Sequence, residues 1–223
     1  MGEREKIRVA VKEGYNLWAE SYDATPNPLV SLDTRHTIHH LSPSEGERIL
    51  DVGCGTGRNI GPLLEAESDV TGVDFSDGMV NVARQKFPQV DFHVHALDEL
   101  PDSLGRFNAI LCALVGEHLT DLHATFKSLI HVLDPDGRMT FSVYHPWLAE
   151  AGKEANFTLG DREYRLGAET HTIADYTEAM QAVGFSQINT TIYNVDQALI
   201  EEVPAAEKYL DRPLLVVIES HRR

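Results

Sequence analysis

Residues 47–57, Glu-Arg-Ile-Leu-Asp-Val-Gly-Cys-Gly-Thr-Gly, combine one carboxylate with three closely spaced glycines. Gly53, Gly55 and Gly57 allow a sharp backbone bend and a close approach to a ligand, because no Cβ stands in the way. Asp51 lies two residues before the first glycine. Its carboxylate would repel a pyrophosphate, and the Gly-x-Gly-x-Gly spacing differs from the dinucleotide fingerprint Gly-x-Gly-x-x-Gly. The stretch therefore favours a ligand with an ammonium group and no phosphate.

A second acid follows at the distance that a ribose site needs. Asp74 ends the apolar run in residues 70–76, Val-Thr-Gly-Val-Asp-Phe-Ser. An acid roughly 20 residues past such glycines can hold both ribose hydroxyls. With Asp51 and the glycine turn, this pattern resembles motif I of class I S-adenosylmethionine (SAM) methyltransferases. A plain strand–turn–helix unit is the alternative, and it does not explain why both acids and the glycines stand in register.

The resemblance covers about residues 45–145 and implies a set of contacts to SAM. In that family the acid and the glycine turn hold the methionine end. Asp98 stands where the adenine amino group is held, and Leu97 would pack on the ring. The cofactor-binding residues that the resemblance implies are Asp51, Gly53, Cys54, Gly55, Gly57, Asp74, Phe75, Met79, Leu97, Asp98 and Ala113.

Residues 14–23, Gly-Tyr-Asn-Leu-Trp-Ala-Glu-Ser-Tyr-Asp, are similar to the Tyr-Asp-x-x-Ala-x-x-Tyr-Asp opening of the ubiquinone, menaquinone and biotin-pathway methyltransferases. The chain keeps four of those positions, Tyr15, Ala19, Tyr22 and Asp23. Asn16 replaces the first acid. In that group the N-terminal helices close over SAM and substrate. Alternatively, Tyr15 and Trp18 simply dock a helix on the core.

Three histidines are candidate bases: His118, His145 and His171. His118 lies in a Glu-His-Leu sequence after the expected fourth strand, and His145 precedes a proline directly after the fifth. Both elements resemble small-molecule methyltransferases. Imidazole suits general-base catalysis on an alcohol, amine or carbon acid, because its pKa is near operating pH. A phenol or carboxylate acceptor would need little more than orientation, and each histidine has the alternative of being an ordinary edge residue.

The expected acceptor pocket is mostly apolar with a few placed polar groups. Its candidate substrate-binding residues are Tyr15, Trp18, Tyr22, His36, Tyr144 and Trp147. His36 and His40 are four residues apart and share a helix face, a spacing that can bind a metal. No Glu stands between them as in zinc proteases. We therefore expect no metal, and a polar wall or plain surface histidines instead.

Alternating strand and helix patterns must position these residues. The fold class that they predict is α/β, a doubly wound parallel sheet. After the opening strand that holds Asp51, strands are expected at 69–74, 90–95, 107–113, 138–144, 186–194 and 214–219. Helices are expected at 3–20, 29–41, from near Gly57, and at 76–87, 121–133 and 172–183. The family resemblance implies a Rossmann-like seven-stranded sheet with the last strand antiparallel.

The chain is predicted to form a single methyltransferase domain over residues 1–223. An N-terminal helical cap occupies 1–44, and a lid insertion occupies 145–171 after the fifth strand. The lid contains a hairpin, residues 157–166, that turns at Gly160-Asp161. A short helix is expected near Pro204.

Composition narrows the partners. The net charge is −16, from 19 basic and 35 acidic side chains, and no Lys/Arg cluster favours nucleic acid or an anionic membrane. The two cysteines form neither a metal nor a disulfide pattern, which fits a reducing cytoplasm. The charged first residues do not predict a signal peptide, and no stretch is long enough to span a membrane. A monomer or homodimer is expected.

The sequence thus predicts a SAM-dependent methyltransferase that moves a methyl group to an O, N or C atom of a small-molecule acceptor by in-line displacement. One alternative is a nicotinamide-dependent oxidoreductase, which the glycine spacing and Asp51 disfavour. Another is a non-catalytic SAM-binding regulatory protein. A protein methyltransferase would favour an open acidic groove, which the bulky lid disfavours. The sequence does not name the acceptor.

Overall fold

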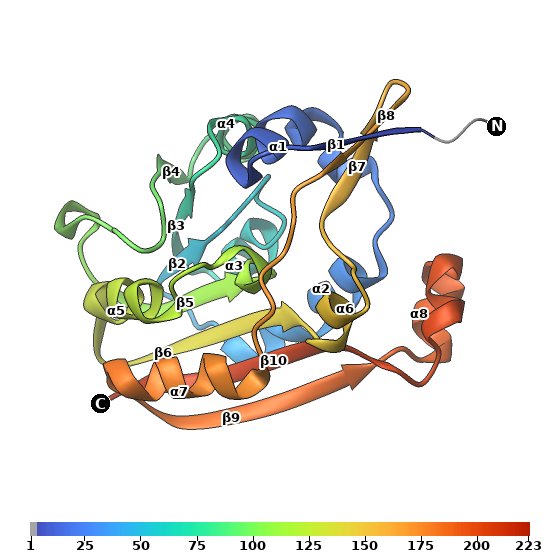
Figure 1. The fold of residues 1–223 in the computed structure, drawn as a ribbon. Coiled ribbons are helices and arrows are strands. Elements are labelled where there is room, and N and C mark those ends of the chain that lie inside the picture. The colour runs from blue at the N-terminus through green and yellow to red at the C-terminus, as the bar shows by residue number, and fades with distance from the viewer. Residues whose placement is uncertain (1–3) are drawn as a thin grey trace.

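The computed structural model describes residues 4–223 and contains a twisted seven-stranded sheet between two layers of helices (Figure 1). The strand order is β4-β3-β2-β5-β6-β10-β9. The strands are β2 (Arg48–Val52), β3 (Asp69–Asp74), β4 (Asp91–Val94), β5 (Phe107–Ala113), β6 (Leu133–Tyr144), β9 (Phe185–Asn194) and β10 (Pro213–Arg222). The last strand, β10, is antiparallel to both neighbours, and the other pairs are parallel. The expected seven-stranded Rossmann-like sheet is confirmed.

Helices cover both faces because strand residues alternate between them. On β2, Leu50 packs in the same cluster as Phe126 of α5, whereas Ile49 packs in the same cluster as Val80 of α4. One layer holds α5 (Leu122–Val132) and α7 (Ile173–Val183). The other holds α2 (Pro28–Leu41), α3 (Ile60–Glu65) and α4 (Asp77–Lys86).

Helix ends follow the local sequence. Ser76 caps α4, since its hydroxyl accepts a hydrogen bond from the Met79 amide at 3.2 Å. Thr172 and Asp175 form a reciprocal capping box at the start of α7. Gly184, with φ at 111°, ends that helix in the left-handed region that glycine tolerates. Both predicted helices are confirmed within a residue of their bounds.

Strand β6 begins earlier than expected. Its pairing with β5 runs from Phe107–Leu133 directly to Ala109–Arg138, so residues 134–137 bulge out of register. Asp136 in this bulge has φ at +63°. The strand expected at 138–144 therefore extends back to Leu133 through an irregular segment at 134–137.

A second, three-stranded sheet joins the chain's beginning to the lid. It has the order β1-β8-β7, with β1 (Glu5–Arg8), β7 (Asn156–Leu159) and β8 (Arg162–Arg165). The hairpin turning at Gly160 is confirmed. The helix expected at 3–20 is wrong over β1, because these residues pair in parallel with β8, a partner invisible to local periodicity. Residue 3 lies outside the described part, and the helical part is α1 (Val11–Trp18) followed by the 3-10 helix η1 (Ala19–Ala24).

Short elements complete the chain. They are η2 (Asp102–Leu104), η3 (Gly116–His118), α6 (Trp147–Glu150), α8 (Gln197–Glu202) and η4 (Pro204–Tyr209). The short helix expected at Pro204 is confirmed as η4. Within residues 4–223, none of the helices combines the length and apolar character that crossing a bilayer requires.

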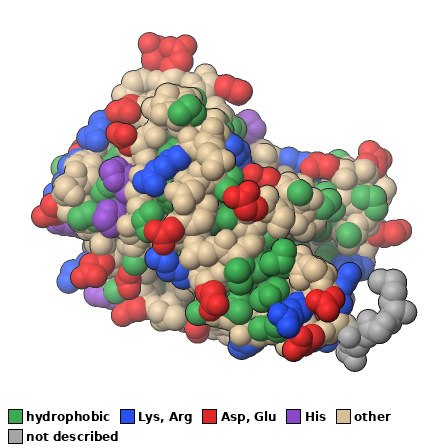
Figure 2. Space-filling view, turned by 90° about the horizontal axis from the view of Figure 1, so that it is seen from above, with side chains coloured by type: hydrophobic (Ala, Val, Ile, Leu, Met, Phe, Trp, Pro, Cys, Tyr) green, Lys and Arg blue, Asp and Glu red, His purple; other side chains and the backbone are tan. Residues whose placement is uncertain are grey.

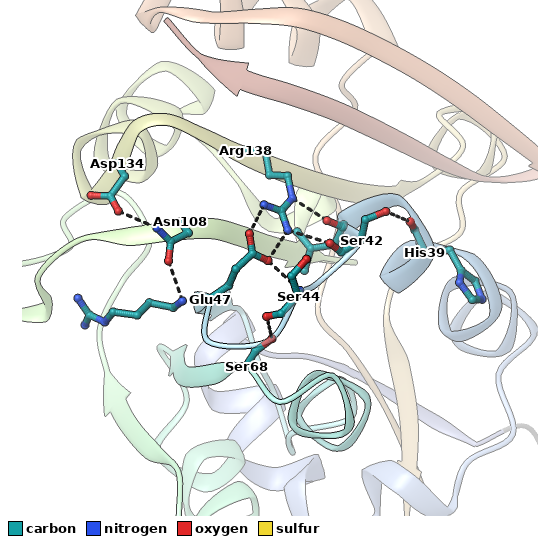
Figure 3. Close-up of polar contacts among 10 residues, drawn as sticks. His39, Ser42, Ser44, Glu47, Ser68, Asn108, Asp134 and Arg138 are labelled. Carbon is teal, nitrogen blue, oxygen red and sulfur yellow. Dashed lines mark hydrogen bonds and ion pairs between the residues drawn. The ribbon is translucent and has the colours of Figure 1, made fainter.

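Arg138 ties the elements together at the end of the sheet where β2 starts (Figure 3). Its guanidinium donates to both carboxylate oxygens of Glu47, at 2.7 and 2.6 Å, and to the backbone carbonyls of Leu41 and Ser42. The hydrogen bonds from Arg138 lower the pKa of Glu47. Bidentate pairs of this kind fix geometry, so Arg138 anchors the end of α2 against β6.

The charged surface is mixed. On the face seen in Figure 2, basic side chains are scattered among acidic ones rather than gathered into one area. This pattern matches the acidic net charge of −16.

Candidate active site

The glycine turn after β2 is folded tightly against β3. Gly53, Gly55 and Gly57 have φ values of +69°, +54° and +84°. The amides of Gly53 and Cys54 donate to the same carbonyl of Val73, at 2.7 and 3.0 Å. A Cβ placed on Gly55 would meet no protein atom within 4 Å. The turn therefore leaves open space beside Gly55.

That space belongs to a cavity of about 280 Å³ at the carboxyl ends of the central strands, where ligands bind in open α/β sheets. Predicted residues that line it are Gly53, Cys54, Gly55, Asp74, Phe75, Met79, Leu97, Asp98, Ala113, Tyr15, Tyr22 and His118. Residues that sequence reasoning missed are Thr56, Arg58, Asn59, Ala96, Leu114, Val115, Leu119, Thr120, Asp121 and Thr125. Four of the ten missed residues, Thr56, Arg58, Leu114 and Leu119, directly follow a predicted one, so adjacency to the motifs was the available signal for these four.

Asp51 lies at the end of β2 and is completely buried. Neither carboxylate oxygen has a hydrogen-bond partner of normal geometry among the described residues, although the Asn59 side chain lies close enough to lower its pKa. Burial raises its pKa to about 7, while the nearby Arg58 opposes the rise. Two buried acceptors without donors fit an ammonium group at the adjoining turn, because such acceptors are costly to leave unpaired. Asp51 itself is not part of the cavity lining.

We expect Asp51→Asn to stabilise the fold at about pH 8 and not at about pH 5. The folded-state pKa lies above the ordinary carboxyl value, so the folded protein keeps the proton between roughly pH 4 and 7. Stability then falls as pH rises through that window. Asparagine removes this penalty, which is about 1.4 kcal/mol per pKa unit. Thermal melts at both pH values measure the effect, with exposed Asp91→Asn as control; equal shifts at both values would contradict it.

Asp74, at the end of β3, is held by the backbone around it. Its two oxygens accept from the amides of Gly55 at 3.0 Å and Ser76 at 2.8 Å. Burial raises its pKa, and these hydrogen bonds oppose the rise. Each carboxylate oxygen can accept more than one hydrogen bond, so the oriented carboxylate retains capacity for ribose hydroxyls.

Tyr15 and His118 form a buried polar pair on the cavity wall. The Tyr15 hydroxyl and His118 Nε2 are 2.9 Å apart, and the rings meet edge to face at 5.4 Å between centroids. Burial lowers the pKa of His118 to about 4 and raises that of Tyr15. Both groups are therefore neutral at physiological pH, and the imidazole can accept a proton at Nε2.

Glu117, next to His118, is a further acid that sequence reasoning did not select. It is buried, and its Oε2 has no partner among the described residues. Burial raises its pKa to about 7. A single acid in the otherwise apolar tip after β5 was the signal for a buried carboxyl.

Arg58 is the cation of the cavity wall, and its charge is already balanced. Nη2 contacts the Asp33 carboxylate at 2.7 Å, and Nη1 donates to the Thr34 hydroxyl at 2.9 Å. Asp33 is completely buried and also accepts hydrogen bonds from Thr37 and Ser142. The ion pair links α2 to the helical start after the glycine turn.

Five further predicted residues do not line the cavity. Gly57 faces the Phe87 ring, which a Cβ would approach to 3.1 Å. Trp18 stacks on Phe157 of the lid, and His36 stacks on Tyr193. Tyr144 is buried with its hydroxyl unpaired among the described residues, and Trp147 donates to the Pro213 carbonyl. Trp18 therefore docks the cap on the lid hairpin, and its contact with a substrate stays a prediction.

The other candidate bases also lie outside the lining. His171 Nε2 is 2.7 Å from the Leu119 carbonyl, behind the wall, and His145 Nδ1 accepts from the Trp147 amide at 3.4 Å. Their role as bases stays a prediction. His40 contacts the Tyr193 hydroxyl and Glu219. Over residues 4–223, no three His, Cys, Asp or Glu side chains are grouped so that they could hold a metal ion.

Comparison with known proteins shows similarity over part of the chain. Residues 49–137 match the family model described as a methyltransferase domain. The chain is 32% identical over 165 residues to the biotin biosynthesis bifunctional protein BioHC of Saccharophagus degradans, covering 70% of this chain and 29% of that protein. It is 33% identical over 111 residues to the ubiquinone biosynthesis O-methyltransferase of Azorhizobium caulinodans, covering 48% and 44%. The chain thus spans less than half the length of these two relatives.

A solved structure shares the fold. The crystal structure of an S-adenosylmethionine-dependent methyltransferase from Mesorhizobium loti superposes with a TM-score of 0.71 at 22% identity. The match covers 85% of this chain and 97% of that one. The methyltransferase fold that the sequence implied is therefore confirmed over most of the chain.

Proposed function

We propose that this chain, as a member of the SAM-dependent methyltransferase family, transfers a methyl group from SAM to an O, N or C atom of a small molecule. One observation carries the proposal: the glycine turn, Asp74 and the Tyr15–His118 pair all line a single cavity. We expect the protein to act in the cytoplasm as a monomer or homodimer, without a nucleic-acid or membrane partner.

The residues present fit SAM. When bound, SAM supplies an electrophilic methyl group on a sulfonium. Gly55 offers backbone without a Cβ to the methionine end, and Asp51 offers unpaired carboxylate oxygens to its ammonium group. Asp74 would hold the ribose, and Asp98 with Leu97 would hold the adenine. These assignments give a ligand partner to the open space beside Gly55 and to the unpaired oxygens of Asp51.

The chain's own contribution to the chemistry is orientation, exclusion of water and proton removal. His118 takes the acceptor's proton at Nε2, directly or through the Tyr15 hydroxyl, which then passes its own proton on. Tyr15 and Tyr22 cover the cavity from the N-terminal segment and keep it apolar. A regulatory SAM-binding protein would have no use for a buried tyrosine–histidine pair at this place, so the pair favours an enzyme.

The charges around the cavity indicate the acceptor class. Its lining contains Asp74, Asp98 and Asp121, and its cation Arg58 is neutralised by Asp33. A phosphate or carboxylate on the acceptor would lose its hydration without gaining an opposite charge. We therefore expect an acceptor that is uncharged or cationic.

Incubating the protein with methyl-labelled SAM and a metabolite extract tests both the methyl transfer and the acceptor class. The extract is first separated by ion exchange into anionic and non-anionic fractions. We expect label only in the non-anionic fraction. Calorimetry measures the binding of SAH (S-adenosylhomocysteine) separately, and we expect binding. Label in the anionic fraction alone would overturn the acceptor class. SAH binding with no label in either fraction would instead favour the regulatory protein.

A further inference from the structure

The helix α1 contacts the start of α4 through Asn16, which stands where the similar methyltransferases have an acid. Asn16 Oδ1 accepts from the Ser76 hydroxyl at 2.7 Å and from the Gly78 amide at 2.9 Å. Asn16 is itself exposed, whereas Ser76 is completely buried. One side-chain oxygen from α1 thus satisfies two donors at the first turn of α4, where amides lack partners within the helix.

Gly78 makes this contact possible. A Cβ at Gly78 would lie 3.0 Å from both the Cα and the carbonyl oxygen of Asn16, closer than backbone atoms can accommodate without moving. The missing Cβ lets α1 approach the start of α4 closely. The position of Asn16 is therefore fixed by shape as well as by hydrogen bonds.

The Asn16 contact is linked to both the cofactor side and the acceptor side of the proposed site. On one side, the Ser76 amide donates to Asp74 at 2.8 Å, the acid assigned to the ribose. On the other side, Tyr15 directly precedes Asn16 on the same helical turn and reaches His118 at 2.9 Å. These contacts form an unbroken series of hydrogen bonds and one backbone step, in the order Asp74, Ser76, Asn16, Tyr15, His118.

We propose that Asn16 is a positioning residue, which sets the Tyr15 hydroxyl against His118 and registers that pair to the acid that holds the cofactor's ribose. This inference rests on the proposed methyl transfer. Asparagine suits the place because its oxygen accepts both hydrogen bonds without charge.

Three variants test the role in the full chain: Asn16→Ala, Asn16→Asp and Lys12→Ala. Asn16→Ala removes the acceptor oxygen, and Asn16→Asp restores an acceptor of the same shape. Lys12→Ala is the matched control, because the exposed Lys12–Asp77 ion pair at 3.0 Å joins the same two helices but does not touch Ser76. We expect Asn16→Ala to lower kcat by about tenfold, the scale for misplaced reacting groups. SAH affinity and acceptor KM should change by less than about threefold, Asn16→Asp should recover most of kcat, and Lys12→Ala should match the wild type.

Histidine NMR gives a readout that needs no turnover. In the wild type, burial holds the pKa of His118 near 4, so its ring should not titrate above about pH 5. In Asn16→Ala a loosened Tyr15 admits water, and the pKa should rise toward the ordinary value of about 6.5. An unchanged His118 titration in Asn16→Ala, or an equal change in Lys12→Ala, would overturn the inference. If the His118 titration shifts as expected but the wild type turns over no acceptor, the proposed function fails and the positioning by Asn16 stands.

Discussion

Replacing Gly55 by leucine is expected to lower SAH affinity by at least about 100-fold, because the new side chain would occupy the place of the ligand. Gly55 lines the cavity, and the direction of its missing Cβ is free of protein atoms. A leucine there meets empty space in the free protein, so the steric conflict arises only with ligand. Calorimetric titration with SAH measures the loss.

The fold should survive this change with a modest penalty. A leucine at φ of +54° costs about 1–2 kcal/mol, the price of left-handed backbone. Gly46→Leu is the matched control, since Gly46 has φ at +75° and also has nothing within 4 Å of its Cβ position. It precedes β2 and so lies at the opposite end of that strand from the glycine turn. The site is supported if the two variants have comparable melting temperatures and only Gly46→Leu binds SAH normally. Normal SAH binding by Gly55→Leu would place the cofactor elsewhere.

Replacing His118 by alanine is expected to lower kcat by about 10²–10⁴-fold, the usual contribution of a general base. Binding of SAH should stay within about threefold, because the histidine is assigned to the acceptor's proton. Tyr15→Phe should lose part of the same factor, and the double variant should lose little more than His118→Ala, since the two groups act through one hydrogen bond. Steady-state kinetics of all three variants measure this coupling.

The pH profile provides the second signature of His118. Burial lowers its pKa to about 4, so it remains neutral and able to accept a proton throughout the physiological range. As pH falls through about 4, it becomes protonated and kcat should fall. An ordinary exposed histidine would place that limb near pH 6.5. His145→Ala is the control, and if that variant lost kcat while His118→Ala did not, the base would be misassigned.

The central sheet followed from sequence because its signals are local. Apolar runs such as Phe107–Ala113 end at turns, and several helices begin at a capping side chain, as α4 does at Ser76. Strand β1 did not follow, since Glu5–Arg8 pairs with a strand whose residues lie 157 positions later in the chain. Local periodicity contains no record of such a partner.

The candidate site, too, could be predicted only in part from the sequence. Gly53, Gly55 and Asp74 line the cavity because they lie at the carboxyl ends of β2 and β3, whereas Asp51 and Gly57 do not line it. Trp147 and His145 were correctly placed at the ligand-binding edge by their position after β6, but their side chains pack beside it. Sequence position specifies the edge of a sheet, whereas side-chain direction depends on neighbours such as Pro213 that only the fold supplies.

The pairing of β1 with β8 has a consequence for unproductive chemistry. Because β1 precedes α1 and hydrogen-bonds to the lid hairpin, and because Gly14 of α1 fits against Leu166 after that hairpin, the lid is connected to Tyr15 through α1. A movement that lifts the hairpin to admit an acceptor would draw Tyr15 away from His118. The proton acceptor would then be assembled only while water is shut out. While the lid is open, no proton acceptor would be assembled beside a bound cofactor. This would protect the reactive methyl group from reaction with water.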